Sequence, residues 1–166
     1  MKKALLLALC LCMSASVFSQ KMSKDKNLLI SSIEKHKEEL IKISDSIWAL
    51  AETAFNETES SRILADYAEK NGLKVTRGVA DIPTAFTATY GSGSPVISIL
   101  GEFDALPGIS QKTSPIKEPF KEGAAGHGCG HNMFGTASLG SAIAIKELMD
   151  AGKITGTVKF LGTPAE

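Results

Sequence analysis

The sequence contains little cysteine, no excess charge of either sign and no long apolar segment. Its 166 residues include three cysteines, and 18 basic residues balance 18 acidic ones. It has no basic stripe with interleaved aromatic residues, which argues against a nucleic-acid-binding protein. It also has no internal repeat and no low-complexity tract. A hydrophobic content of 43% at this length predicts one globular domain with a substantial core.

The one sizeable apolar run lies at the N-terminus and is too short to span a bilayer. Lys2 and Lys3 precede apolar residues 4–11, and small residues follow up to Ser19. This pattern is typical of a secretory signal peptide over residues 1–19, with cleavage between Ser19 and Gln20. An uncleaved anchor is the alternative. We therefore expect an exported protein, periplasmic or secreted, with no stable membrane anchor and with residues 20–166 as its folded part.

Removal of residues 1–19 leaves Cys129 as the only thiol. An odd cysteine in an oxidising compartment pairs between chains, stays reactive or binds a metal. Cys129 lies between His127 and His131, and only glycines separate the three residues. Glycine permits backbone angles that aim neighbouring side chains at one point, so we expect two of the three on a metal. A glycine-rich loop with incidental histidines and a cysteine–histidine nucleophile pair are the alternatives.

The hydrophobic pattern predicts an α/β fold. Apolar residues at spacings of three and four predict helices over 23–50, 57–70 and 131–151. Alternation predicts strands over 73–77, 86–90 and 157–161, whereas the continuous run at 96–100 predicts a strand covered on both faces. Between these elements, Asn56–Glu59 resembles a capping box, Gly91–Gly93 a hairpin turn and 108–123 a loop.

Three carboxyl groups follow predicted strands, at Glu102, Asp104 and Glu166. In open α/β sheets, binding sites lie beyond the carboxyl ends of the strands. A carboxylate beside a metal accepts the proton of an attacking water in hydrolysis. A lone carboxylate after a strand is more often a cap or a solvated end, and spacing alone does not choose among the three.

Three ordered motifs resemble the M20 metallopeptidase family. They are Gly-Glu-Phe-Asp-Ala-Leu-Pro-Gly at 101–108, Gly-His-Gly-Cys-Gly-His-Asn at 126–132 and Gly-Thr-Pro-Ala-Glu at 162–166. Within that family the resemblance is to amidohydrolases acting on N-acyl or aminobenzoyl amino acids. It implies a zinc-peptidase-like α/β catalytic domain with a mostly parallel sheet flanked by helices. Residues 20–166 would be its N-terminal part, with a lid and dimerisation domain and further ligands beyond position 166.

The same resemblance implies roles for individual residues. Cys129 and His131 match metal ligands, and Glu166 matches the general base of a Glu-Glu pair. Asp104 matches an aspartate that is held near the site and orients a ligand.

Three further residues remain candidates for orienting a ligand or facing the substrate: His127, Asn132 and Glu102. The wider family has a histidine ligand at the position of Glu102. Many relatives have an aspartate at the position of Asn132. These two departures leave both positions without a firm role.

The resemblance therefore implies a metal-dependent amidohydrolase, carboxypeptidase-like, that uses Zn²⁺ or Mn²⁺ with two ions per complete subunit. Its substrate would be a small acyl-amino acid or dipeptide-like molecule, and the full-length form would be a homo- or hetero-oligomer. Two alternatives stay open: a truncated, non-catalytic metal-binding fragment, and a thiol-reactive protein acting through Cys129. Since the second glutamate of the pair would be residue 167, the 166-residue chain alone is expected to be inactive.

Overall fold

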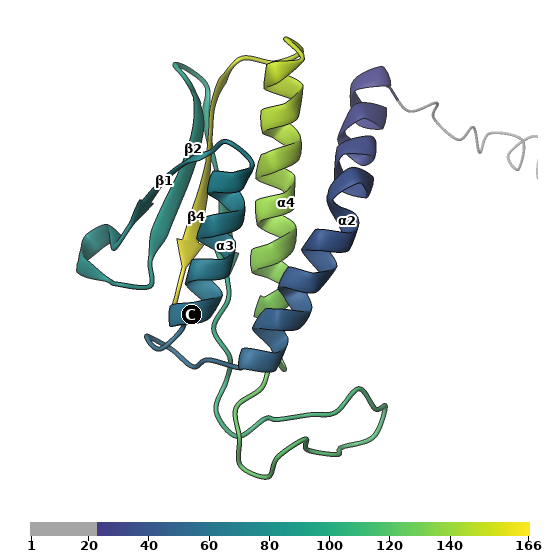
Figure 1. Ribbon diagram of the computed structural model, residues 1–166, viewed down its shortest axis with the longest axis vertical. Helices are drawn as coiled ribbons and strands as arrows, with labels where there is room; N and C mark the ends of the chain where they lie inside the picture. The colour runs from purple at the N-terminus through teal and green to yellow at the C-terminus, as the bar shows by residue number, and fades with distance from the viewer. Residues whose placement is uncertain (1–22) are drawn as a thin grey trace, which may run out of the picture.

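The computed structural model describes residues 23–166, so the predicted signal peptide and its cleavage site lie outside the described residues. The elements in chain order are α2 (Lys24–Leu50), α3 (Thr58–Lys70), β1 (Lys74–Arg77), η1 (Val79–Asp81), β2 (Phe86–Ser92), β3 (Val96–Glu102), α4 (His131–Asp150) and β4 (Gly156–Thr163). Figure 1 shows this arrangement of helices and strands, and it confirms the predicted α/β class. Within residues 23–166, no helix has the length and hydropathy needed to cross a membrane.

The four strands form one mixed sheet in the order β1-β2-β4-β3. β1 pairs with β2 and β2 with β4 in antiparallel orientation, whereas β3 and β4 are parallel. One of the three pairings is therefore parallel, where the resemblance implied a mostly parallel sheet. The hairpin predicted at Gly91–Gly93 is wrong, because β4 lies between β2 and β3. The parallel pair requires a crossover connection, and α4 provides it.

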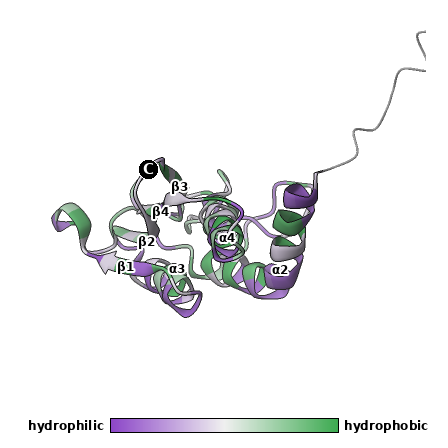
Figure 2. Cartoon of the chain, turned by 90° about the horizontal axis from the view of Figure 1, so that it is seen from above, coloured by the Kyte–Doolittle hydropathy of each residue, from purple (hydrophilic) through white to green (hydrophobic). Residues whose placement is uncertain are grey.

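The helices cover one face of this sheet. Figure 2 shows α2, α3 and α4 on the same side of the strands. Phe86, Val158 and Phe160 are buried on that face, and the rings of the two phenylalanines lie 5.5 Å apart. On β3, Val96 and Leu100 are 54% and 58% exposed. The prediction that β3 is covered on both faces is therefore wrong for the described residues, because the three helices pack on the opposite face.

The first turns of α4 approach the end of β3 closely. A Cβ atom added at Gly135 would lie 2.5 Å from the carbonyl oxygen of Glu102, and one at Gly101 would lie 3.1 Å from the Cα atom of Gly135. The small side chains of α4 thus let the helix backbone touch the strand, as the sequence predicted. This contact fixes the start of α4, and with it His131, against the end of β3.

The substitution Gly135→Ala is expected to destabilise the protein by about 1–3 kcal/mol, because backbone would have to move to admit the methyl group. This loss should exceed the gain of about 1 kcal/mol in helix propensity. Gly140→Ala is the matched control in the same helix, because its Cβ would meet the flexible end of Leu40 at 2.9 Å. Urea unfolding of both variants checks the prediction. Equal changes in unfolding free energy would contradict it.

The start of α3 differs from the prediction. The helix begins at Thr58, and its N-cap residue, Glu57, makes no side-chain capping hydrogen bond. The carboxyl group of Glu52 instead accepts hydrogen bonds from the backbone N–H groups of Glu59, at 3.1 Å, and Ser60, at 2.8 Å. The predicted capping box at 56–59 is therefore wrong, because the carboxyl group of Glu52, six residues before the first helical residue, caps the helix and leaves Glu57 free for another role.

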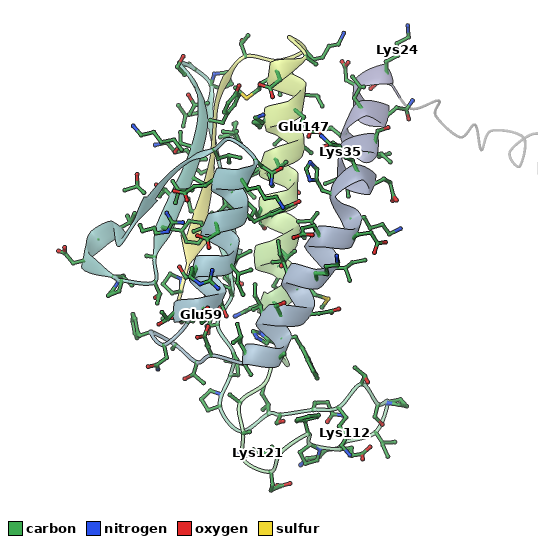
Figure 3. The ribbon with its side chains drawn as sticks, viewed as in Figure 1. Lys24, Lys35, Glu59, Lys112, Lys121 and Glu147 are labelled. Carbon is green, nitrogen blue, oxygen red and sulfur yellow. The ribbon has the colours of Figure 1, made fainter. Side chains whose placement is uncertain are left out.

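A polar cluster ties α2 to α3 and α4. His36 Nδ1 lies 2.8 Å from the hydroxyl of Tyr67, and His36 Nε2 lies 3.0 Å from Glu147 Oε1. Lys35 donates to the same Glu147 oxygen at 2.6 Å, and Figure 3 shows these two labelled side chains facing each other. Burial by itself would raise the pKa of Glu147, but hydrogen bonds from Lys35 and His36 outweigh it and lower that pKa to about 2. His36 therefore serves helix packing.

Candidate metal centre and active site

Two neighbouring strands and one helix meet at one edge of the sheet. In the parallel pair, Glu102 at the end of β3 is opposite Thr163 at the end of β4. Asp104 follows β3 after one residue, Glu166 follows β4, and α4 begins at His131. In Figure 1 the C-terminal end of the chain and the start of α4 both lie at the lower end of the sheet. The edge predicted to carry a site thus gathers its acidic groups around a histidine.

His131 is the buried centre of this group. Its side chain is 3% exposed, and its Nδ1 atom lies 3.0 Å from Oδ1 of Asp104, which is itself 2% exposed. A carboxylate only accepts hydrogen bonds, so the Nδ1–H group of His131 donates this hydrogen bond to Asp104. This bond fixes the orientation of the ring and leaves the Nε2 lone pair for a metal ion.

The Nε2 atom of His131 faces two further carboxyl groups. Glu102 Oε2 lies 3.3 Å from it, and Glu166 Oε2 lies 3.9 Å from it. One ligand atom from each of the three residues falls within 4.8 Å of the others. Two carboxyl oxygens and one imidazole nitrogen at this separation form a donor set that suits Zn²⁺ or Mn²⁺. The residues at this edge therefore fit the metal implied by the sequence.

Asp104 also holds Glu166 in place. Its Oδ1 atom accepts a second hydrogen bond, at 3.3 Å, from the backbone N–H of Glu166. The side chain of Glu166 is 60% exposed, in contrast to the buried His131 and Asp104. Asp104 thus links the histidine to the residue predicted as the general base, and Glu166 keeps the access to solvent that a proton-transfer group needs.

Cys129 lies in the tight turn that leads into α4. The backbone N–H of Gly130 donates to the carbonyl of His127 at 3.1 Å, which closes the turn around Cys129. The thiol is free and exposed. The three ligand atoms that converge within 4.8 Å come from Glu102, His131 and Glu166, so Cys129 is not among them. The ligand role of Cys129 stays a prediction, whereas Glu102, which sequence reasoning left unassigned, joins the converging set.

His127 lies outside this converging set. Its Nε2 atom lies 3.0 Å from the carbonyl of Ile47, and its Nδ1 atom is buried without a hydrogen-bond partner. Burial lowers the pKa of His127. The residue lines a pocket of about 470 Å³ with Trp48 and Phe120. A neutral imidazole that donates from Nε2 leaves Nδ1 as an acceptor, and the role of His127, orienting a ligand or facing the substrate, stays a prediction.

Asn132 is directed away from the carboxyl groups. Its Nδ2 atom donates to the hydroxyl of Ser44 at 3.0 Å. Asn132 is buried, and this bond connects the first turn of α4 to α2. Asn132 thus holds the helix that begins with His131, without contacting the converging groups in this structure.

Sequence reasoning missed Glu57 as a residue of this region. It is fully buried, and its Oε1 atom accepts a hydrogen bond from the backbone N–H of Ala165 at 2.9 Å. Its place beside Asn56 predicts only a part in a helix cap. Its distance of 108 residues from Ala165 left no local signal for this contact.

The segment that contains these residues resembles a known protein family. The model of peptidase family M20/M25/M40 matches residues 99–166, the segment that contains Glu102, Asp104, His131 and Glu166. Residues 99–166 thus resemble part of a peptidase M20 domain. It is 44% identical over 135 residues to a component of the p-aminobenzoyl-glutamate hydrolase of Escherichia coli (strain K12), a match that covers 81% of this chain and 28% of that relative.

Solved structures share the fold of this chain. The Bacillus subtilis YXEP protein, described as a dinuclear metal binding peptidase from the M20 family, is 26% identical with a TM-score of 0.67, over 80% of this chain and 36% of that one. An aminobenzoyl-glutamate utilization protein from Klebsiella pneumoniae has the same fold, with a TM-score of 0.56 at 15% identity, over 83% of this chain and 39% of that one. The chain spans 28–32% of the length of three curated relatives that it matches.

Proposed function

We propose that the complete protein that carries this chain is a metal-dependent amidohydrolase that cleaves the amide bond of N-acyl or aminobenzoyl amino acids. The match of residues 99–166 to the M20 family and the likeness to the p-aminobenzoyl-glutamate hydrolase of E. coli support this reaction class. The observation that carries the proposal is the convergence of Glu102, His131 and Glu166 at one sheet edge. A small acyl-amino acid or dipeptide-like molecule is the proposed substrate.

Glu102, His131 and Cys129 are the residues that would hold the ion. Imidazole and thiolate suit Zn²⁺, and carboxylates also suit Mn²⁺. When bound, such an ion lowers the pKa of a coordinated water and polarises the amide carbonyl. Asp104 keeps the His131 ring oriented through its 3.0 Å hydrogen bond. The buried pair thus provides a rigid donor at the edge of the site.

Glu166 moves the proton in the proposed reaction. The water oxygen attacks the amide carbon, and a carboxylate oxygen of Glu166 takes the proton that the water loses. The carbon–nitrogen bond then breaks, and Glu166 passes this proton to the leaving amine nitrogen. The products are a carboxylic acid and a free amine. The exposure of Glu166 suits this role better than that of a fixed ligand.

The test is an amidase assay on the complete protein loaded with Zn²⁺ or with Mn²⁺. Aminobenzoyl-glutamate, N-acetyl amino acids and dipeptides are incubated with it, and the released amine is measured by chromatography. We expect cleavage of at least one acyl-amino acid, loss of activity on chelation and recovery on return of the metal. Failure to cleave any of them by protein with bound metal would refute the proposal.

The substitution Cys129→Ser is expected to weaken Zn²⁺ affinity at least about tenfold, because loss of even an outer partner of a metal ligand has an effect of that size. Isothermal titration with Zn²⁺ checks this in the complete protein. Ser141→Ala, a substitution in the middle of α4, is the control. Equal affinity in wild type and Cys129→Ser would remove Cys129 from the ligand set and favour the thiol-reactive alternative.

Export of the protein is part of the proposal. The cationic and apolar residues at 2–11 support a signal peptide that ends between Ser19 and Gln20. N-terminal sequencing of the mature protein tests this assignment, and an N-terminus at Met1 would refute it.

Assembly into an oligomer is likewise proposed for the complete protein, and light scattering tests it.

A further inference from the structure

The segment between α2 and α3 is tied to the backbone beside two site residues. The carbonyl of Glu52 accepts a hydrogen bond from the N–H of Ala105 at 2.7 Å, next to Asp104. The carboxyl group of Glu57 accepts one from the N–H of Ala165 at 2.9 Å, next to Glu166. Both contacts come from residues outside the matched segment 99–166. The two residues that hold the backbone beside Asp104 and Glu166 thus lie before the segment that contains the three motifs.

Glu57 is an unusual residue to find fully enclosed. Its exposed fraction is 0%. Its Oε1 atom accepts from the N–H groups of Phe55, at 2.8 Å, and Ala165, and its Oε2 atom accepts from the Thr84 hydroxyl at 3.1 Å. A buried carboxyl group is strongly unfavourable unless hydrogen bonds compensate it. Here the donors come from three separate segments, so the side chain joins the α2–α3 loop, the start of β2 and the end of β4.

Two of these donors belong to residues with a disfavoured backbone. Ala165 has φ of 59° and Phe55 has φ of 62°, in the left-handed region that residues with a Cβ atom rarely adopt. The same oxygen of Glu57 binds both N–H groups. Such conformations persist only where the surrounding structure enforces them, and they cluster at functional sites. At Ala165 this turn sends the next residue, Glu166, toward His131.

We infer that Glu57 is a positioning residue that holds Glu166 in reach of the reacting water by fixing the backbone at Ala165. This inference rests on the proposed function, in which Glu166 transfers the proton. Two consecutive N–H groups then set the place of Glu166: that of Ala165 on Glu57, and that of Glu166 itself on Asp104. Loss of the first leaves the second, so Glu166 should remain near the site but lose its precise position.

The test compares side-chain length with charge at position 57 in the complete protein. Glu57→Gln keeps the length and an acceptor oxygen, whereas Glu57→Asp keeps the charge but withdraws the carboxyl group by one methylene. We expect Glu57→Asp to lower kcat at least about tenfold, since small misplacements of a catalytic group have large effects. Glu57→Gln should stay within about threefold of wild type, and KM should change little in both.

Glu52→Asp is the matched control. The carboxyl group of Glu52 also accepts hydrogen bonds from two backbone N–H groups, but both belong to the first turn of α3 and not to the end of β4. It should leave kcat within about threefold of wild type. A loss of kcat in Glu52→Asp equal to that in Glu57→Asp would make the effect structural and overturn the inference. A larger loss in Glu57→Gln than in Glu57→Asp would also overturn it, because charge and not reach would then matter.

Hydrogen–deuterium exchange at the Ala165 amide gives a readout that does not depend on activity. Exchange should rise in Glu57→Asp, and to a smaller extent in Glu57→Gln, whose neutral oxygen is a weaker acceptor. If Glu57→Asp does not fold, the Glu57→Gln result decides: unchanged exchange at Ala165 overturns the inference. A wild-type protein that cleaves no amide would refute the proposed function, whereas the exchange result would still decide whether Glu57 holds Ala165.

Discussion

Glu166→Gln is expected to lower kcat for amide cleavage by about 10²–10⁴-fold in the complete protein, while the bound metal content stays unchanged. Glutamine has nearly the same shape as glutamate but neither accepts nor returns a proton at neutral pH. General acid–base groups typically contribute a factor of this size. The backbone N–H of Glu166 would still donate to Asp104, so the chain should keep its path.

The decisive measurement is single-turnover kinetics combined with metal analysis of the same samples. Glu122→Gln, the same chemical change at an exposed position of the loop before α4, is the control and should leave kcat unchanged. Turnover of Glu166→Gln within tenfold of wild type would exclude Glu166 as the general base. A parallel loss of bound metal would instead make Glu166 a ligand, in line with its oxygen 3.9 Å from His131 Nε2.

The sequence predicted the helices and strands well because their signals are local. The stripe that includes Ile43 and Ile47 predicted α2, and both residues are buried in the core. The small residues after His131 predicted close packing of α4, and the contact of Gly135 with the carbonyl of Glu102 explains it. The periodicity of apolar residues and the size of side chains are properties of residues close together in the chain, so they are visible in a single sequence.

The order of the strands in the sheet, and the faces of the strands that the helices cover, have no such local signal in the sequence. β4 pairs with both β2 and β3, and its residues follow β2 by more than 60 positions. Gly91 and Gly93 at the end of β2 therefore resemble a hairpin turn although the partner strand comes later. The apolar residues of β3 likewise indicated two covered faces, whereas the helices occupy one. The apolar residues of a strand show that both of its faces are able to pack against other elements. They do not show which segments of the described chain cover those faces.

The sequence predicted only part of the site, because local motifs are visible in it and contacts between distant residues are not. Motif residues gave the acidic groups and His131, since each follows a strand or begins a helix. The contact between Glu57 and Ala165 joins positions 108 apart, and no local pattern around Glu57 indicates it. The ligand role of Cys129 stays a prediction: its close spacing to His131 predicts a shared ion, and the structure brings Glu102 and Glu166 to that histidine. Spacing gives proximity along the chain, and the direction of each side chain depends on the fold.

Asp104→Asn is expected to weaken Zn²⁺ or Mn²⁺ affinity of the complete protein by about 10–100-fold, the usual effect of changing a group that orients a metal ligand. Asparagine is able to accept through Oδ1 at the same place, so the fold should persist. It lacks the negative charge that makes His131 a stronger ligand, and its amide also allows the ring to adopt the other tautomer. Both His131 and Asp104 are nearly fully buried, so water does not replace the missing charge.

The matched control is Asp81→Asn, which makes the same change at an exposed residue in a left-handed conformation that asparagine tolerates. Metal titration of both variants should show a loss of affinity only at position 104. An unchanged affinity in Asp104→Asn, with an unchanged melting temperature, would contradict the orienting role. Loss of metal in Asp104→Asn, together with metal retained in Glu166→Gln, would separate the two acidic residues by function: Asp104 would set the histidine that binds the ion, and Glu166 would move the proton.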